Sequence, residues 1–148
     1  MTTASSPTTE FQLLYTGRVW SVLAWDQLTA LWKRVDPAAG WYLLAVGVSP
    51  TPTLADAATV SAFIERIDAL LRADHHESYC GIVYADDLEN PRLIKIYDPN
   101  NLGSSCGSSK NPPGPGWIMS RVKPDEMSPT AQAPANRKRW WQGLLGDS

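Results

Sequence analysis

The stretch from Tyr79 to Val122 constrains the fold of this chain more than any other part of the sequence. It contains three short β-rich runs, at 79–85, 92–97 and 117–122. The turn-forming residues between the first two runs predict an antiparallel hairpin. Because a third run follows, we expect all three strands to belong to a mostly antiparallel sheet.

A long loop, residues 98–116, separates the second run from the third. Fifteen of its nineteen residues are Gly, Pro, Ser or Asn. A loop of this length is unusual inside a compact domain and is usually functional or disordered. Its prolines fix φ and stiffen the segment just before Trp117. We therefore predict that the 98–117 loop contacts a partner protein, with Trp117 as an anchoring side chain.

Two helices are expected before this meander. The first is predicted at 25–35, where apolar residues recur at the spacing of an amphipathic helix. The second is predicted at 53–75, where either Thr53 or Asp56 can serve as the N-cap. The apolar stripe of the second helix consists of Val60, Phe63, Ile64, Ile67, Leu70 and Leu71.

The remaining segments predict two more strands and a linker. Residues 11–15 (FQLLY) have strand composition, whereas residues 18–23 are ambiguous. The apolar run 40–48 predicts a strand that is buried on both faces, near the middle of the sheet. Residues 49–53 (SPTPT) are expected to form a rigid linker, because proline cannot donate a hydrogen bond to a neighbouring strand.

The predicted fold class is α+β. We expect a mostly antiparallel sheet of about five strands with two helices on one face, in the order β-α-β-α-β-β-β. A length of 148 residues indicates one domain. The predicted organisation is a disordered leader at 1–10, a single α+β domain at 11–123, a flexible linker at 124–136 and a basic, aromatic docking tail at 137–148.

Charge and hydropathy narrow the range of partners and compartments. The formal net charge is −2 and the domain shows no basic stripe, so we expect no nucleic-acid partner. Residues 1–10 lack the basic start and apolar core of a secretory signal. No apolar run approaches the ~20 residues that span a bilayer. We therefore expect a cytoplasmic protein, in which thiols stay reduced.

Two cysteines and two adjacent histidines are the residues most suited to chemistry. Cys106 lies between Gly/Ser runs whose backbone N–H groups can lower a thiol pKa, so Cys106 is a candidate catalytic thiol and Cys80 a candidate second thiol. The side chains of His75, His76, Cys80 and Cys106 also suit Zn or Fe. Structural roles compete with these readings, since buried cysteine behaves as a small hydrophobe. The sequence has no C-x-x-C motif and no nucleotide-binding loop, so no cofactor is predicted.

A basic, aromatic and apolar cluster follows the predicted linker. Two adjacent tryptophans are expected to bury their rings, because large apolar groups leave water. Three locations remain open: the domain itself, a groove on a partner protein, and a membrane surface. The predicted partner-binding residues of the tail are Arg137, Lys138, Arg139, Trp140, Trp141, Leu144 and Leu145.

These features favour a small cytoplasmic accessory or adaptor protein that binds a partner protein. The contacts would come from the 98–117 loop and the C-terminal RKRWWQGLL segment, since a second tethered contact raises avidity. The alternative is a thiol-dependent redox or metal-handling protein that uses Cys106 with Cys80 and His75 or His76. Enzymatic activity stays open with the balance against it, because no complete catalytic constellation is visible.

Overall fold

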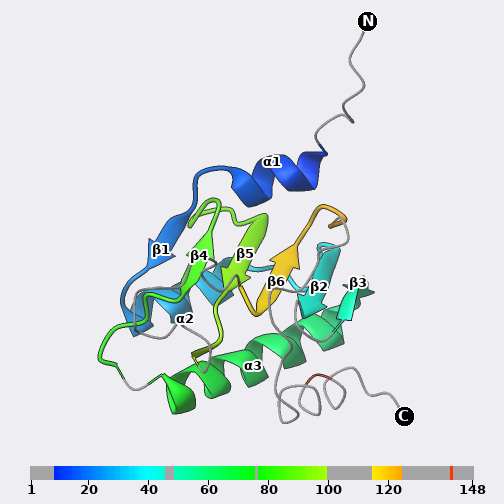
Figure 1. Cartoon of the computed structure of the whole chain (residues 1–148). Coiled ribbons are helices and arrows are strands. Elements are labelled where there is room, and N and C mark those ends of the chain that lie inside the picture. Colours follow the sequence, from blue (N-terminus) through cyan, green and yellow to red (C-terminus); the bar gives the residue numbers. More distant parts are fainter. Residues whose placement is uncertain (1–8, 46–48, 76, 100–114, 125–140, 142–148) are drawn as a thin grey trace, which may run out of the picture.

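In the part of the chain that the structure describes, a six-stranded antiparallel sheet forms the centre of the fold, and three helices pack on it (Figure 1). The computed structural model describes residues 9–45, 49–75, 77–99, 115–124 and 141. The helices are α1 (Glu10–Thr16), α2 (Trp25–Arg34) and α3 (Ala57–Asp74). The strands are β1 (Trp20–Val22), β2 (Trp41–Ala45), β3 (Ser49–Ala55), β4 (Val83–Ala85), β5 (Leu93–Ile96) and β6 (Trp117–Ser120).

The strand order is β1-β4-β5-β6-β2-β3, so β6, the last of the described strands along the chain, lies inside the sheet. Ile118 of β6 is opposite Lys95 of β5 on one side and opposite Leu44 of β2 on the other. β4 and β5 form the antiparallel hairpin that their sequences predict. The predicted α+β class and the antiparallel sheet are therefore confirmed.

The two faces of the sheet are covered by different helices. α2 and α3 pack on one face and bury the larger core, which includes Leu31, Phe63, Ile94 and Met119. α1 packs on the opposite face, where a smaller core forms. Figure 1 shows α1 lying well apart from α2 and α3. The smaller core consists of Phe11, Leu14, Leu44, Leu93 and Ile118.

The prediction of a strand at 11–15 is wrong, because these residues belong to α1. The Thr9 side chain accepts a hydrogen bond from the Gln12 N–H at 3.0 Å, and the Gln12 side chain accepts one from the Thr9 N–H at 3.2 Å. This reciprocal capping box defines the start of the helix. Phe11 and Leu14 are three residues apart and therefore lie on one helical face, which is the buried face.

The prediction of a linker at 49–53 is also wrong, because these residues belong to β3. β3 pairs antiparallel with β2 and ends the sheet that the structure describes. Proline is compatible with such a strand because one side of the strand needs no hydrogen-bond donors. The end position thus explains how a proline-containing segment can be extended and paired.

Among the described residues the order of elements is α-β-α-β-β-α-β-β-β, with six strands in place of about five and three helices in place of two. The two predicted helices do share one face of the sheet. Asp56, and not Thr53, caps the longer one, since its side chain accepts a hydrogen bond from the Thr59 N–H at 2.8 Å. The predicted stripe is buried at Phe63 and Ile67, which are both fully inaccessible to solvent.

Candidate functional site

Two of the tryptophans that the sequence assigns to partner binding are core residues. Trp117 and Trp141 are each only 3% exposed and both belong to the larger core. Trp141 contacts Phe63 of α3. Burial removes both side chains from the surface that a partner can contact, so we no longer assign them as partner contacts. Of the three locations considered for the tail tryptophans (the domain, a partner groove and a membrane surface), the structure shows that Trp141 is buried in the domain.

The other predicted partner contacts lie outside the described residues. This holds for most of the 98–117 loop, of which the structure describes residues 98–99 and 115–117. It also holds for Arg137, Lys138, Arg139, Trp140, Leu144 and Leu145.

Cys80 is a buried thiol just before β4. Its side chain is fully inaccessible to solvent, and this burial raises the pKa of the thiol. A raised pKa leaves less of the nucleophilic thiolate at neutral pH. The surroundings of Cys80 therefore fit a small core side chain better than a reactive one. Its proposed partner, Cys106, lies outside the described residues.

His75 has a structural role at the end of α3. It caps the helix through its backbone N–H, and its ring Nε2 lies 2.9 Å from the carbonyl oxygen of Cys80. The rings of Trp25 and Tyr79 flank the imidazole, with centroid distances of 6.0 Å and 6.1 Å. Because a carbonyl can only accept, Nε2 is the protonated nitrogen in this contact. The ring ties the end of α3 to the chain that enters β4.

The predicted metal ligands do not form a cluster in the described part of the chain. There, no group of three His, Cys, Asp or Glu side chains is arranged to hold an ion. His75 and Cys80 contact each other through a ring nitrogen and a backbone oxygen, and the Cys80 thiol is not part of that contact. His76 and Cys106 lie outside the described residues.

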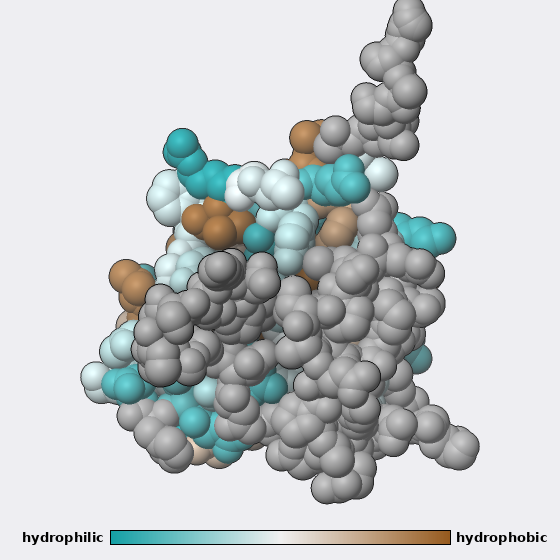
Figure 2. Space-filling model, viewed as in Figure 1, coloured by the Kyte–Doolittle hydropathy of each residue, from teal (hydrophilic) through white to brown (hydrophobic). Residues whose placement is uncertain are grey.

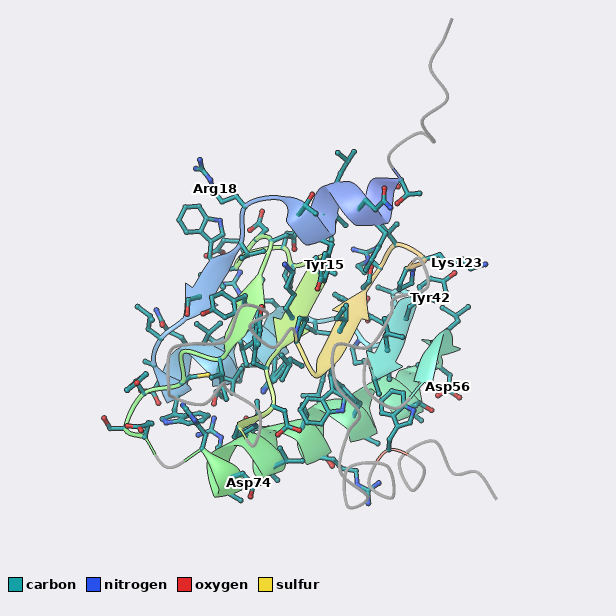
Figure 3. All side chains as sticks on the ribbon, in the orientation of Figure 1. Tyr15, Arg18, Tyr42, Asp56, Asp74 and Lys123 are labelled. Carbon is teal, nitrogen blue, oxygen red and sulfur yellow. The ribbon has the colours of Figure 1, made fainter. Side chains whose placement is uncertain are left out.

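The surface at β1 was not predicted from the sequence, and it differs from the sites above because its apolar side chains are exposed. Trp20 is 51% exposed, and Leu23, which follows the strand, is 60% exposed. Trp20 is directly opposite Ala85 of β4. Ala85 belongs to the larger core beneath α2 and α3, so Trp20 lies on the same face of the sheet. The Arg18 guanidinium lies 6.0 Å from the centre of the Trp20 ring, within reach of a cation–π contact. Figure 3 labels Arg18 close to β1.

A shallow groove of about 180 Å³ lies between α2 and the turn that joins β4 to β5. Gln27 places this groove next to Leu23, because its side chain accepts hydrogen bonds from the N–H groups of Leu23 and Ala24, both at 3.0 Å. The salt bridge between Arg34 and Glu89, at 2.8 Å, forms part of the rim. The lining residues are Gln27, Ala30, Leu31, Arg34, Leu88 and Glu89.

β1 with Trp20 and Leu23, together with this groove, is called the β1 surface below. β1 has β4 as its one neighbour among the described strands, so within the described residues no strand pairs with its other edge. Figure 2 shows patches of apolar surface on the side of the molecule where β1 lies. An end strand beside exposed apolar side chains is a surface that suits an extended peptide.

The ambiguity of residues 18–23 explains why the sequence did not reveal this surface. An exposed tryptophan has the same sequence signal as a buried one, and only the pairing of β1 at the end of the sheet distinguishes them. The end position depends on strand order, which the sequence pattern does not encode directly.

No family model, curated protein or solved structure matches this chain. Within the described residues, none of the helices has the length and apolar character needed to cross a membrane.

Proposed function

We propose that this protein is an accessory module that binds a partner protein, with the β1 surface as its main contact. The observation that carries the proposal is the exposure of Trp20 and Leu23 beside an end strand. Tryptophan is enriched at the energetic centres of interfaces, because one ring buries a large area on contact. An extended segment of the partner would pair with the β1 backbone and place a side chain in the adjoining groove.

The C-terminal segment is proposed to add a second contact. Arg137, Lys138 and Arg139 carry three positive charges close together, which favours an acidic region of the partner. Such a contact would weaken as salt screens the charges. The burial of Trp141 supports this arrangement, since Trp141 follows Arg139 by two residues in the sequence and itself contacts the core of the domain.

The experiment is affinity capture with the full chain from extracts of its own cells. The test variant is Trp20→Ser with Leu23→Ser. The matched control is Leu13→Ser with Leu54→Ser, because these two leucines are 62% and 61% exposed and lie on α1 and β3, away from β1. We expect the wild type and the control to retain the same protein, and the test variant to bind it at least tenfold more weakly.

The proposal fails if the test variant binds the retained protein as well as the wild type does. A third variant, with Arg137, Lys138 and Arg139 all replaced by Ala, tests the second contact separately. Its expected effect is a smaller loss of affinity and a weaker dependence of affinity on salt. Trp20, Leu23, Leu13 and Leu54 are all exposed. The protein is therefore expected to stay folded when these residues are replaced.

The alternative function, thiol-dependent redox or metal chemistry, now depends on Cys106. The buried Cys80 thiol and the structural contact of His75 argue against their participation. The cysteine experiment described in the Discussion tests the Cys80 part of this alternative.

A further inference from the structure

Lys95 occupies an unusual position for a charged residue. It belongs to β5, which lies inside the sheet between β4 and β6. The neighbouring residues Ile94 and Ile96 face α2 and α3, whereas Leu93 faces α1. Because side chains alternate along a strand, Lys95 lies on the α1 side with Leu93. A lysine is rarely placed on a covered face of a central strand unless its charge has a partner.

The Lys95 ammonium group uses only some of its three N–H donors in the hydrogen bonds that the structure describes. Its Nζ donates a hydrogen bond to the carbonyl oxygen of Tyr15 at 2.6 Å. It also lies 4.1 Å from the centre of the Tyr15 ring. The carbonyl belongs to the last turn of α1, where helix carbonyls lack partners within the helix, so Lys95 stabilises the end of α1. An ammonium group has three N–H donors, and this contact uses one of them.

Two further tyrosines lie around the same position. Tyr84 of β4 is the cross-strand partner of Lys95, and Tyr97 follows Lys95 by two residues. The rings of Tyr84 and Tyr97 make an edge-to-face contact with centroids 5.6 Å apart. Figure 3 labels Tyr15 below α1, next to the upper part of the sheet. The Tyr15 ring thus lies next to the ammonium group, and the Tyr84 ring, which Tyr97 contacts, belongs to the residue opposite Lys95 on the neighbouring strand.

The phenols of Tyr15 and Tyr97 have pKa values that keep them as hydrogen-bond donors at neutral pH. Burial raises the pKa of Tyr15, and the neighbouring Tyr97 raises it further. Burial also raises the pKa of Tyr97, with a second contribution from Tyr84. Raised pKa values keep these hydroxyl groups protonated and able to donate hydrogen bonds.

No carboxylate among the described residues forms an ion pair with Lys95. The two acidic groups that form ion pairs at this end of the sheet, Glu10 and Asp86, both pair with Arg92. Burial also lowers the pKa of Lys95, since removal from water disfavours the charged form. An anion beside the ammonium group would offset this cost.

We propose that Lys95, Tyr15, Tyr84 and Tyr97 form a binding site for a small anionic group, a carboxylate or a phosphate. The ammonium supplies the charge, and the phenol hydroxyls supply neutral donors that suit several anion oxygens. Partial burial strengthens the attraction relative to a fully exposed lysine. The site lies on the α1 side of the sheet, which is the face opposite Trp20, although its Tyr84 is paired with Ser21 of β1. It does not depend on the proposed partner.

The test is a titration of the full chain followed by NMR of the lysine side-chain ε-CH₂ groups. Sodium phosphate and sodium acetate are the probes, and sodium chloride at equal ionic strength is the reference. We expect the Lys95 signal to shift saturably with at least one probe and not with chloride. Saturation with phosphate alone identifies a phosphate site, and saturation with acetate identifies a carboxylate site.

Two variants complete the test. Lys95→Met keeps the apolar stem and removes the charge, so the dissociation constant measured through the Tyr ring signals should rise at least tenfold. Lys33→Met is the matched control, because Lys33 is exposed on α2 at the opposite face of the sheet, and it should leave the constant unchanged. The proposal is overturned if the Lys95 signal of the wild type responds to the probes only as it does to chloride, or if both variants bind equally well. The wild-type signal decides the question even if Lys95→Met fails to fold.

Discussion

Trp141 lies edge-on against Phe63, with the two ring centroids 6.3 Å apart and the ring planes at 85°. Phe63 is fully buried in the middle of α3, and Trp141 is 3% exposed. A residue close to the C-terminal end of the sequence is therefore part of the main hydrophobic core. This contact changes what we expect from substitutions near that end.

Trp141→Ala is expected to lower the free energy of unfolding by about 3–5 kcal/mol, as large-to-small changes of buried aromatic residues do. Urea denaturation followed by circular dichroism measures the loss. The matched control is Trp20→Ala, which removes a half-exposed ring and should cost less than about 1 kcal/mol. Equal, small losses for both variants would mean that the Trp141 ring contributes little to the core.

The contact between Phe63 and Trp141 should also show energetic coupling. In a double-mutant cycle with Phe63→Ala and Trp141→Ala, the coupling energy is expected to be about 0.5–1.5 kcal/mol, the usual value for an edge-to-face pair. A parallel cycle that joins Phe63→Ala to Trp20→Ala should give a value near zero. Coupling of equal size in both cycles would show that the effect is not specific to this pair.

Asp56→Ala should destabilise α3 in a pH-dependent way. The hydrogen bond from Thr59 lowers the pKa of Asp56 below its ordinary value of 3.8. The stabilising contribution is therefore present above pH 3.8 and is lost as the pH falls through the lowered pKa of the folded state. Melting temperatures measured from pH 7 to pH 2 should differ between wild type and variant at neutral pH and converge in acid.

The control for Asp56 is Asp26→Ala, which removes an acidic residue in the first turn of α2 that is not the N-cap. Its effect on the melting temperature should be smaller than that of Asp56→Ala. A difference between the Asp56 variant and wild type that stays constant down to pH 2 would contradict the assigned capping role.

Cys80 should resist alkylation in the folded protein. In a Cys106→Ser background, iodoacetamide at pH 8 should modify Cys80 far more slowly than it modifies the same chain in urea, because the thiol is buried and its pKa is raised. The same raised pKa predicts that its contribution to stability is complete below the ordinary value of 9.0 and is lost as the pH rises through the folded-state pKa. Fast modification of the folded chain at pH 8 would restore Cys80 as a candidate reactive thiol.

The parts of the fold that follow from local pattern were predictable from the sequence. α3 has a long apolar stripe with a capping aspartate, so both its existence and its buried face could be read directly. The β4–β5 hairpin and β6 follow from short β-rich runs between turn residues. These elements required no knowledge of which strands are neighbours.

The sequence-based predictions were wrong where the position of a segment in the fold, and not its amino-acid composition, decides its secondary structure. Residues 11–15 fit a helix as well as a strand, and the capping box at Thr9 and Gln12 decides for the helix. Residues 49–53 are extended because the end of the sheet tolerates proline. Trp141 follows a stretch of low complexity, which carries no signal that the chain returns to the core. The Lys95 cluster was equally hidden, because Tyr15, Tyr84 and Lys95 come together only through strand pairing and the packing of α1.

The position of β6 between β5 and β2 has a consequence for how the chain is made. Until residues 117–120 have left the ribosome, the β1-β4-β5 and β2-β3 parts of the sheet each lack the strand that joins them. Both β5 and β2 then present unpaired backbone groups along one side, a state that favours pairing with other chains. The nascent chain must therefore pass through a period of exposed strand edges, and a translation product that ends before Trp117 should aggregate where one that contains β6 can fold.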